Sequence, residues 1–263
     1  MKRILFLSLL VFALVLSACG PKTPANHLDA IKQAGVLRVG TSADYPPFEY
    51  VDESGKKIGF DIELMEEVVK RLELKLEWVD MPFDSLIAGV QENKIDMAIS
   101  AFNYSAERDE KVDFTDEYYS TEDSFLVADS FAGEIANPED VAQYNVGVQS
   151  GTVQDDWLTD ELIETGLMPE GNLFRYERVD QAALDLKAGR IDVLMSDYLP
   201  AEALVAQQGG LKIVYRGQLY SGPMNMVVPE GDQDLAAELN TVIAELRDEG
   251  FIQTLAEKYM GLE

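Results

Sequence analysis

The sequence predicts an α/β protein built from two similar lobes. Short apolar strands alternate with amphipathic helices between residues 36 and 99, and this order favours a mainly parallel sheet with helices on both faces. The same order begins again after Asn137-Pro138. Segments 85–100 and 182–197 share a layout in which a helix ends, an Ile-Asp pair starts an apolar strand and a serine marks its end. This internal similarity indicates two lobes of like construction.

Each predicted element follows from local apolar periodicity and from the residues that bound it. In chain order the elements are strand 36–41, helix 61–72, strand 74–79, helix 82–93, strand 95–99, strand 144–148, helix 153–158, a helix ending near 189, strand 191–195, strand 211–215, strand 224–228, a long helix 235–249 and a last helix 251–259.

The loop after the first strand contains Pro46-Pro47, which can continue neither a strand nor a helix. Tyr45 and Phe48 flank the pair and are predicted to be exposed. Asp61 is predicted to be the N-cap of the helix that follows.

The amino-acid composition and net charge limit the classes of partner that this protein can bind. The chain has 263 residues, 47% of them hydrophobic, enough for one large domain or two modest ones. The 48 acidic and 21 basic residues give a net charge of −27 that is spread along the whole chain. Such a field repels nucleic acid and anionic lipid surfaces, so neither is an expected partner.

The N-terminus has the features of an export signal. Lys2 and Arg3 precede an apolar run over residues 4–16 that is too short to span a bilayer comfortably and ends in small residues. Cys19, the only cysteine, directly follows Leu-Ser-Ala, which resembles the bacterial lipoprotein box. We therefore expect residues 1–18 to be a signal peptide and Cys19 to carry lipid, which places the protein outside the cytoplasm on a membrane anchor. An ordinary signal peptide with an incidental cysteine is the alternative.

Residues 19–27 are predicted to be a tether, with Pro and small residues between the lipid and the domain. His27, the only histidine, lies at its end and is expected to be inert. Because His27 is the only histidine, most kinds of metal site and every catalytic triad that uses histidine are excluded. Ser150 is not in a Gly-x-Ser-x-Gly elbow either, so a serine hydrolase is excluded.

Arg108 is the cation that best suits a ligand site. It closes the stretch 100–108, which follows the strand predicted at 95–99, and function in α/β sheets concentrates where strands end. A guanidinium can hold a carboxylate by two parallel hydrogen bonds. The carboxylate could belong to an acidic neighbour such as Glu107 or to a ligand. Asp197, which ends the corresponding strand of the second half, could cap the next helix or pair with an ammonium group.

Several segments together resemble a known family. They are 37–41 with Tyr45-Pro46-Pro47-Phe48-Glu49, Gly59-Phe60-Asp61-Ile62, 83–87, Lys94-Ile95-Asp96, Glu107-Arg108, 112–116 with Tyr118-Tyr119, 147–152 and Gly189-Arg190-Ile191-Asp192. In order and spacing they are similar to the amino-acid-binding extracellular solute-binding proteins of ABC importers, the group containing the histidine- and glutamine-binding proteins. The similarity covers nearly all of the mature chain.

The resemblance implies a periplasmic-binding-protein-like fold with a ligand cleft between two α/β lobes. Lobe one would comprise residues 28–126 and 222–263, and lobe two residues 127–221. A two-strand hinge would lie near 125–127 and 222–223. The implied partners are a free L-amino acid and an ABC importer permease. The expected protein is a monomer without cofactor or metal and is not an enzyme.

The resemblance also implies residue roles. Arg108 would clamp the ligand α-carboxylate, and Thr152, with the backbone amides of Thr152 and Val153 at a helix N-terminus, would hold it from the other lobe. Asp197 would pair with the α-ammonium group. Tyr45 and Phe83 would sandwich the ligand side chain, although either could be an ordinary core residue.

Three positions depart from the family pattern. Asn103 stands where relatives commonly have Ser or Thr, and Ala101 where they often have Gly. Ser42 replaces an aspartate that reads the polar end of the ligand. A polar, uncharged ligand side chain is therefore expected, while a basic one is left open by two carboxylates. The uncharged side chain is expected from the polar residues Ser42, Asn103, Gln149 and Tyr198. The two carboxylates are those of Asp44 and Glu49.

Two other functions remain open from the sequence. Cyclohexadienyl or arogenate dehydratases share the fold and need one protonated carboxyl in the cleft as a general acid. A sensory receptor component that reports occupancy to a membrane partner is the second.

Overall fold

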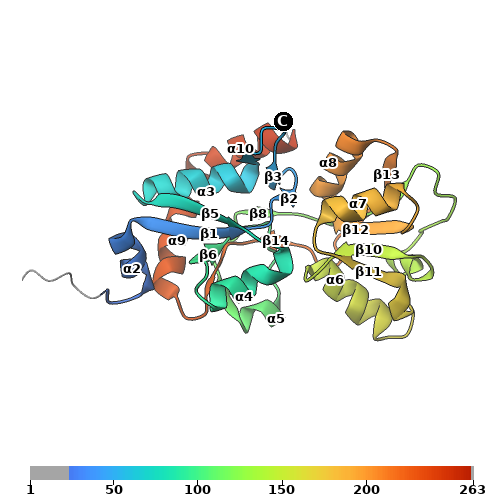
Figure 1. Ribbon diagram of the computed structural model, residues 1–263, viewed down its shortest axis with the longest axis horizontal. Coiled ribbons are helices and arrows are strands. Elements are labelled where there is room, and N and C mark those ends of the chain that lie inside the picture. Colours follow the sequence, from blue (N-terminus) through green and yellow to red (C-terminus); the bar gives the residue numbers. More distant parts are fainter. Residues whose placement is uncertain (1–23, 262–263) are drawn as a thin grey trace, which may run out of the picture.

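The computed structural model describes residues 24–261, which form two α/β lobes side by side (Figure 1). The predicted signal peptide, the lipidation site at Cys19 and tether residues 19–23 lie outside the described residues. Within 24–261, no helix combines the length and apolar character needed to cross a bilayer.

Lobe 1 is built on a mixed sheet of five strands. In spatial order they are β5 (Lys75–Asp80), β1 (Val36–Thr41), β6 (Met97–Ala98), β15 (Val227–Pro229) and β7 (Val112–Phe114). Strand β1 pairs in parallel with β5 and β6, whereas β15 runs antiparallel to β6 and β7. The carboxyl ends of β1 and β6 point toward the other lobe (Figure 1).

Helices cover both faces of this sheet, and the longer ones bury one apolar stripe each. They are α2 (His27–Ala34), α3 (Phe60–Arg71), α4 (Leu86–Gln91) after a 3₁₀ turn at Phe83–Ser85, α5 (Ala106–Asp109), α9 (Gln233–Asp248) and α10 (Phe251–Met260). A small antiparallel sheet of β2 (Asp44–Tyr45), β3 (Glu49–Val51) and β4 (Lys57–Ile58) joins β1 to α3.

Lobe 2 repeats this plan. Its strands, in spatial order, are β11 (Leu173–Tyr176), β10 (Val146–Gln149), β12 (Val193–Asp197), β9 (Asp123–Ala128) and β13 (Leu211–Gly217). Its helices are α6 (Val153–Trp157), which continues as a π-helix over Leu158–Ile163, α7 (Val179–Lys187) and α8 (Tyr198–Gln208), with short 3₁₀ turns at Pro138–Gln143 and Glu170–Asn172.

The internal similarity predicted from the sequence extends to single contacts. A Cβ on Gly40 of β1 would lie 2.3 Å from Ile95 Cδ1, and one on Gly147 of β10 would lie 2.4 Å from Ile191 Cδ1. In each lobe the isoleucine of the Ile-Asp pair therefore packs flat on a glycine of the first strand. The aspartates match as well: Asp96 accepts from the backbone of β1 at 2.7 Å, and Asp192 accepts from the residue before β10 at 2.9 Å.

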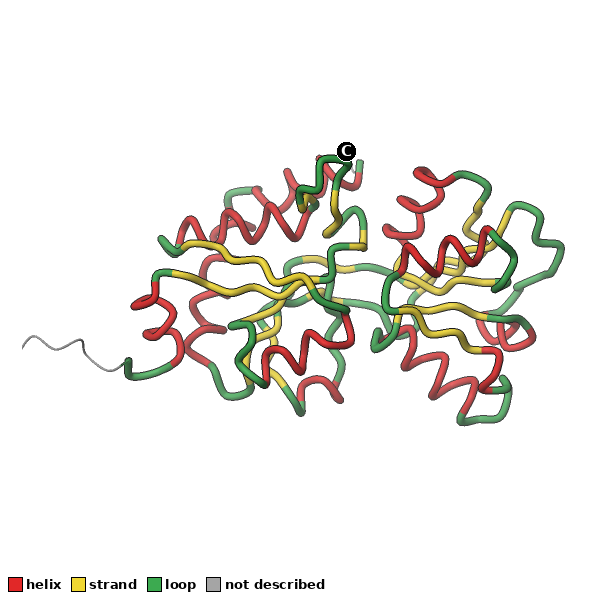
Figure 2. The backbone as a smooth tube through the Cα atoms, in the orientation of Figure 1, coloured by secondary structure: helices red, strands yellow, loops and turns green. Residues whose placement is uncertain are grey.

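Two chain segments connect the lobes (Figure 2). The short strands β8 (Tyr119–Ser120) and β14 (Pro223–Met224) pair antiparallel beside them. Strand β9 pairs with β12 and β13 from Asp123 onward, so the first connection lies before Asp123 and not at the predicted 125–127. The prediction failed because the apolar run 125–127 belongs to an inner strand of the lobe 2 sheet and not to a hinge. The second connection passes through Gly222, within the predicted 222–223, directly before β14.

Four other predictions are wrong, and the fourth concerns the N-cap of α3. Tyr45 and Phe48 are buried, with 8% and 0% of their surface exposed, because the small sheet folds this loop onto lobe 1. His27 begins α2 instead of ending a tether, and its ring nitrogens contact Asp232 and Asp96 at 2.5 and 3.4 Å. The run 224–228 is divided between β14 and β15.

Asp61 does not cap α3. The helix starts at Phe60 with Gly59 as N-cap, where φ is 132° and a Cβ would lie 2.2 Å from the carbonyl oxygen of Phe48. Only glycine fits this close approach. Asp61 is one residue inside the helix, and its fully buried side chain points into the lobe.

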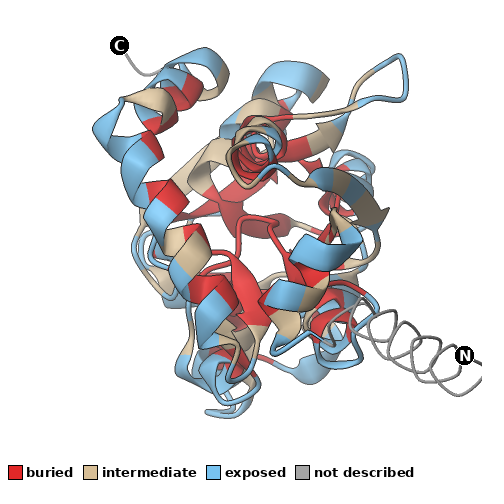
Figure 3. Cartoon of the chain, turned by 90° about the vertical axis from the view of Figure 1, so that its left-hand side faces the viewer, coloured by how far each residue is buried: buried red, intermediate tan, exposed pale blue. Residues whose placement is uncertain are grey.

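Buried residues concentrate on the sheets and on the inner faces of the helices (Figure 3). The largest apolar cluster contains residues of both lobes, among them Phe48 of lobe 1 and Leu194 of lobe 2. The lobes are thus in contact, and the site between them is closed.

Candidate functional site

A small pocket lies between the lobes. It is lined by residues of both lobes: Ser42, Tyr45, Glu49, Phe83, Ser100, Ala101, Asn103, Arg108, Gln149, Thr152, Val153, Gln154 and Asp197. All ten site residues predicted from the sequence are among them. The three that were not predicted to bind are Glu49, Ser100 and Gln154.

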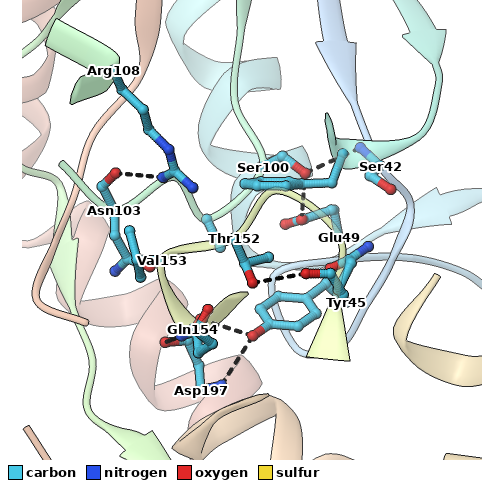
Figure 4. A pocket seen from close by; sticks show the side chains of 13 residues that line it. Ser42, Tyr45, Glu49, Ser100, Asn103, Arg108, Thr152, Val153, Gln154 and Asp197 are labelled. Carbon is cyan, nitrogen blue, oxygen red and sulfur yellow. Dashed lines mark hydrogen bonds between the residues drawn. The ribbon is translucent and has the colours of Figure 1, made fainter. Parts of the chain in front are cut away.

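Arg108 reaches the pocket from α5 of lobe 1 (Figure 4). Only 6% of its surface is exposed. Its guanidinium donates to the backbone carbonyls of Asn103, at 2.7 Å, and Gly151 of lobe 2, at 2.8 Å. It also lies 5.6 Å from the ring centre of Phe83. Burial lowers the pKa of Arg108, but a guanidinium that starts near 12.5 stays charged.

The alternative of a surface ion pair for Arg108 does not hold. Glu107 pairs with Lys111 at 2.7 Å, and Asp109 accepts from the hydroxyl of Tyr104 at 3.3 Å. The guanidinium is held in place by carbonyl groups, which position its charge without neutralising it.

Asp197 lies at the opposite side of the pocket (Figure 4). It ends β12, and its carboxylate accepts from Tyr45 at 2.8 Å, Gln154 at 3.0 Å and Ser221 at 2.8 Å. Its side chain makes no capping bond to α8, so the alternative role of a helix cap is excluded. Burial, and then the charge of Asp123, raises the pKa of Asp197 to about 7. A cation beside Asp197 would stabilise the charged form of its carboxyl group.

The two aromatic residues predicted to sandwich the ligand have different surroundings. Phe83 stacks on Phe102 with ring centres 4.5 Å apart and forms an apolar wall. The hydroxyl of Tyr45 crosses to lobe 2, where it lies 3.0 Å from Ser196 Oγ in addition to Asp197. Tyr45 therefore joins the lobes as well as lining the pocket.

Thr152 is the N-cap of α6. Its hydroxyl donates to the carbonyl of Gln149 at 2.8 Å and accepts from the amide of Asp155 at 3.3 Å. The backbone at Thr152 and Val153 begins the helix, where first-turn amides have no intrahelical partner and favour an anion.

Ser42, Ser100 and Glu49 form a third side of the pocket (Figure 4). The hydroxyl of Ser100 donates to Glu49 Oε1 at 2.7 Å and accepts from the amide of Ser42 at 3.0 Å. The Ser42 hydroxyl donates to Asp44 at 2.8 Å. Glu49 is 1% exposed, because strand β3 carries it beneath the small sheet. In the sequence, Glu49 follows the aromatic-proline loop and was one of the two carboxylates that left a basic ligand open.

Ala101 and Asn103, two of the departures from the family pattern, shape the loop below Arg108. Ala101 has φ of 48°, in the left-handed region that favours glycine, and its amide donates to Asp61 at 2.8 Å. The Asn103 amide group donates to the carbonyl of Gly222 at 3.3 Å. The loop is thereby tied to the second connection between the lobes.

Gln149 links the two lobes. Its amide group donates to Asp44 of lobe 1 at 3.3 Å and to the carbonyl of Glu177 at 3.2 Å. Across residues 24–261, no three His, Cys, Asp or Glu side chains are grouped as a metal site would need.

A closed pocket between two α/β lobes, with a cation and a carboxylate on opposite sides, defines a two-lobed solute-binding protein. The chain belongs to the bacterial extracellular solute-binding proteins, family 3, whose sequence model matches residues 37–262.

Known relatives agree with this assignment. The lysine/arginine/ornithine-binding periplasmic protein of Escherichia coli is 30% identical, with 98% of this chain and 96% of that protein covered. Holo ArgBP from T. maritima superposes with a TM-score of 0.78 and 36% identity, covering 88% of this chain and 98% of that one. An ancestral amino acid-binding protein, a precursor of cyclohexadienyl dehydratase, has a TM-score of 0.80 and 30% identity, with coverage of 89% and 99%.

Proposed function

We propose that this protein captures a free amino acid outside the cytoplasmic membrane and delivers it to an ABC importer. The observation that carries the proposal is the placement of Arg108 and Asp197 on opposite sides of one buried pocket. An amino acid zwitterion has one carboxylate and one ammonium group, and this pair of side chains complements both. The names of its relatives, which bind lysine, arginine, ornithine or histidine, support the same ligand class.

Closure between lobes makes the binding of two charges energetically tolerable. A buried ion without a partner costs several kcal/mol, whereas a paired and hydrogen-bonded one does not. Arg108 pairs with the α-carboxylate, assisted by Thr152 and the amide of Val153, and Asp197 pairs with the α-ammonium group. Phe83 and Tyr45 exclude water from the ligand side chain.

We further propose that Cys19 is lipidated after removal of residues 1–18 and that the monomer is tethered to the membrane. The support is the sequence Leu16-Ser17-Ala18-Cys19 behind an apolar run. Replacing Cys19 with serine should release the protein from the membrane fraction, and mass spectrometry should detect acyl chains on the wild-type N-terminus only.

The ligand class is tested by a thermal-shift screen of the twenty amino acids, citrulline, ornithine and cystine, followed by calorimetry. We expect Arg108→Ala to abolish binding and Arg108→Lys to weaken it at least tenfold, because lysine keeps the charge but loses the two-pronged geometry. Arg190→Ala, an exposed arginine on lobe 2, is the matched control and should bind normally. Undiminished affinity in Arg108→Ala would refute the proposed site, and conversion of prephenate to phenylpyruvate would favour a dehydratase instead.

A further inference from the structure

Helix α7 of lobe 2 receives a cap from a side chain of lobe 1. The amide of Val179, the first residue of α7, donates to Asp44 Oδ2 at 2.7 Å, although 135 positions separate the two residues. Asp44 lies in β2 and is 4% exposed. Arg178, the N-cap residue of α7, makes no capping bond with its own side chain. The Asp44 carboxylate thus binds one of the amides that have no partner within the helix. We call this contact the interlobe cap.

A second hydrogen bond crosses between the lobes beside the interlobe cap. The guanidinium of Arg178, in lobe 2, donates to the carbonyl of Ala43, in lobe 1, at 3.0 Å. A side chain of each lobe therefore binds the backbone of the other lobe. Ala43 and Val179 are each 1% exposed, so water does not compete for the groups between them. The start of α7 and the loop after β1 form a buried, directional contact.

This contact lies beside the ligand pocket and not in it. In the described part of the chain, Ala43, Asp44, Arg178 and Val179 are not among the residues that line the pocket. The pocket is enclosed by both lobes, so the lobes must separate before a bound molecule can leave. Their separation breaks the interlobe cap and leaves the first amide of α7 to water. The cap therefore stabilises the closed state without touching the ligand.

We propose that Asp44, by capping α7 from the opposite lobe, slows the reopening of the closed protein and so sets the release rate of the bound amino acid. The inference rests on the proposed function, because it concerns release from that same pocket. The size of the effect follows from helix capping: loss of an N-terminal cap shifts an equilibrium about two- to thirtyfold. Only the closed state has this cap, so the shift falls on reopening.

Two substitutions of Asp44 separate capping from charge. Asp44→Ala and Asp44→Asn both remove the negative charge, but asparagine keeps an oxygen that can accept from a helix amide. Amino-acid binding and release are followed by stopped-flow fluorescence. The probes are L-arginine, L-histidine and L-cystine, after the relatives, together with the amino acid that gives the largest thermal shift. We expect Asp44→Ala to release the amino acid about five- to thirtyfold faster, with association changed less than twofold, and Asp44→Asn to remain within twofold of wild type.

A substitution in lobe 2 tests the other partner of the interlobe cap. Val179→Pro removes the amide hydrogen that Asp44 accepts, and proline suits the first position of a helix. The preceding residue, Arg178, has φ of −135° and ψ of 138°, which a following proline tolerates. This variant leaves intact the weaker bond from Gln149 to Asp44 at 3.3 Å. We expect release as fast as in Asp44→Ala, and no more than twofold faster when both substitutions are combined.

The matched control removes a helix cap that does not cross between the lobes. Asn26 caps α2 within lobe 1, where its side chain accepts from the amide of Asp29 at 2.8 Å. Asn26→Ala should lower stability but release the amino acid at the wild-type rate. Wild-type release by Asp44→Ala, or equally fast release by Asp44→Ala and Asp44→Asn, would overturn the inference even if Val179→Pro did not fold. Absence of binding by every amino acid would instead overturn the proposed function.

Discussion

The hydroxyl of Tyr45, on lobe 1, lies 2.8 Å from the carboxylate Oδ2 of Asp197, on lobe 2, although 152 positions separate them in the chain. The backbone amide of Asp197 donates to the same hydroxyl at 3.0 Å. Through these hydrogen bonds Tyr45 connects the two lobes. They also orient the carboxylate that is proposed to bind the ligand ammonium group.

Removing that hydroxyl should weaken ligand binding. In Tyr45→Phe the ring remains, but a buried hydrogen bond to a charged group, worth about 1.5 to 3 kcal/mol, is lost from the closed state. We expect amino-acid affinity to fall about ten- to a hundredfold in calorimetry. Tyr104→Phe is the control, because Tyr104 is exposed and its hydroxyl bonds within lobe 1. Equal affinity of Tyr45→Phe and wild type would show that the contact between lobes is dispensable.

The pKa of Asp197 predicts how ligand-free stability depends on pH. Its value is about 7 in the folded protein against 3.8 for the ordinary group, so between these values the folded state holds a proton that the unfolded state has released. Stability contributed by this group is therefore full below pH 4 and is lost as pH rises to 7.

Relative to Asp197→Asn, which cannot titrate, the wild-type protein should lose about 1.4 kcal/mol of unfolding free energy per pH unit between pH 5 and 6, about half as much per unit near pH 7, and almost none above pH 8. Urea denaturation at pH 5, 6, 7 and 8 measures the difference. A difference that stays constant across this range would contradict the raised pKa.

Ala101 should tolerate glycine unusually well. Its left-handed φ costs a non-glycine residue about 1 to 2 kcal/mol, which Ala101→Gly relieves, while the lost methyl group removes about 0.8 kcal/mol of burial. We expect the unfolding free energy of Ala101→Gly to lie within about 1 kcal/mol of wild type. Ala98→Gly, in β6 and equally buried, gains no such relief and should lose about 1.5 kcal/mol. Equal losses in urea denaturation would show that Ala101 is not strained.

Local pattern was sufficient to predict the alternation of strands and helices, the likeness of the lobes and the position of Asp197 at a strand end. These features follow from residue periodicity and from the geometry of parallel sheets, which bring the carboxyl ends of strands to one edge. The resemblance to the solute-binding family then supplied the roles of the residues in the cleft.

Tertiary structure alone decided the partners of the buried polar groups. Asp61 has the sequence context of an N-cap, but the helix begins one residue earlier, with Gly59 close to Phe48. The buried side chain of Asp61 instead accepts from the amide of Ala101 and the hydroxyl of Tyr118. The run 125–127 looked like a connection, and pairing with β12 and β13 makes it part of an inner strand of the lobe 2 sheet. The sequence by itself determined the order of strands and helices, because that depends on local periodicity, and the residues at the cleft came from the resemblance to the family. Which donors reach the buried carboxyl groups and which hydroxyl joins the lobes depends on contacts between distant segments, which no local pattern encodes.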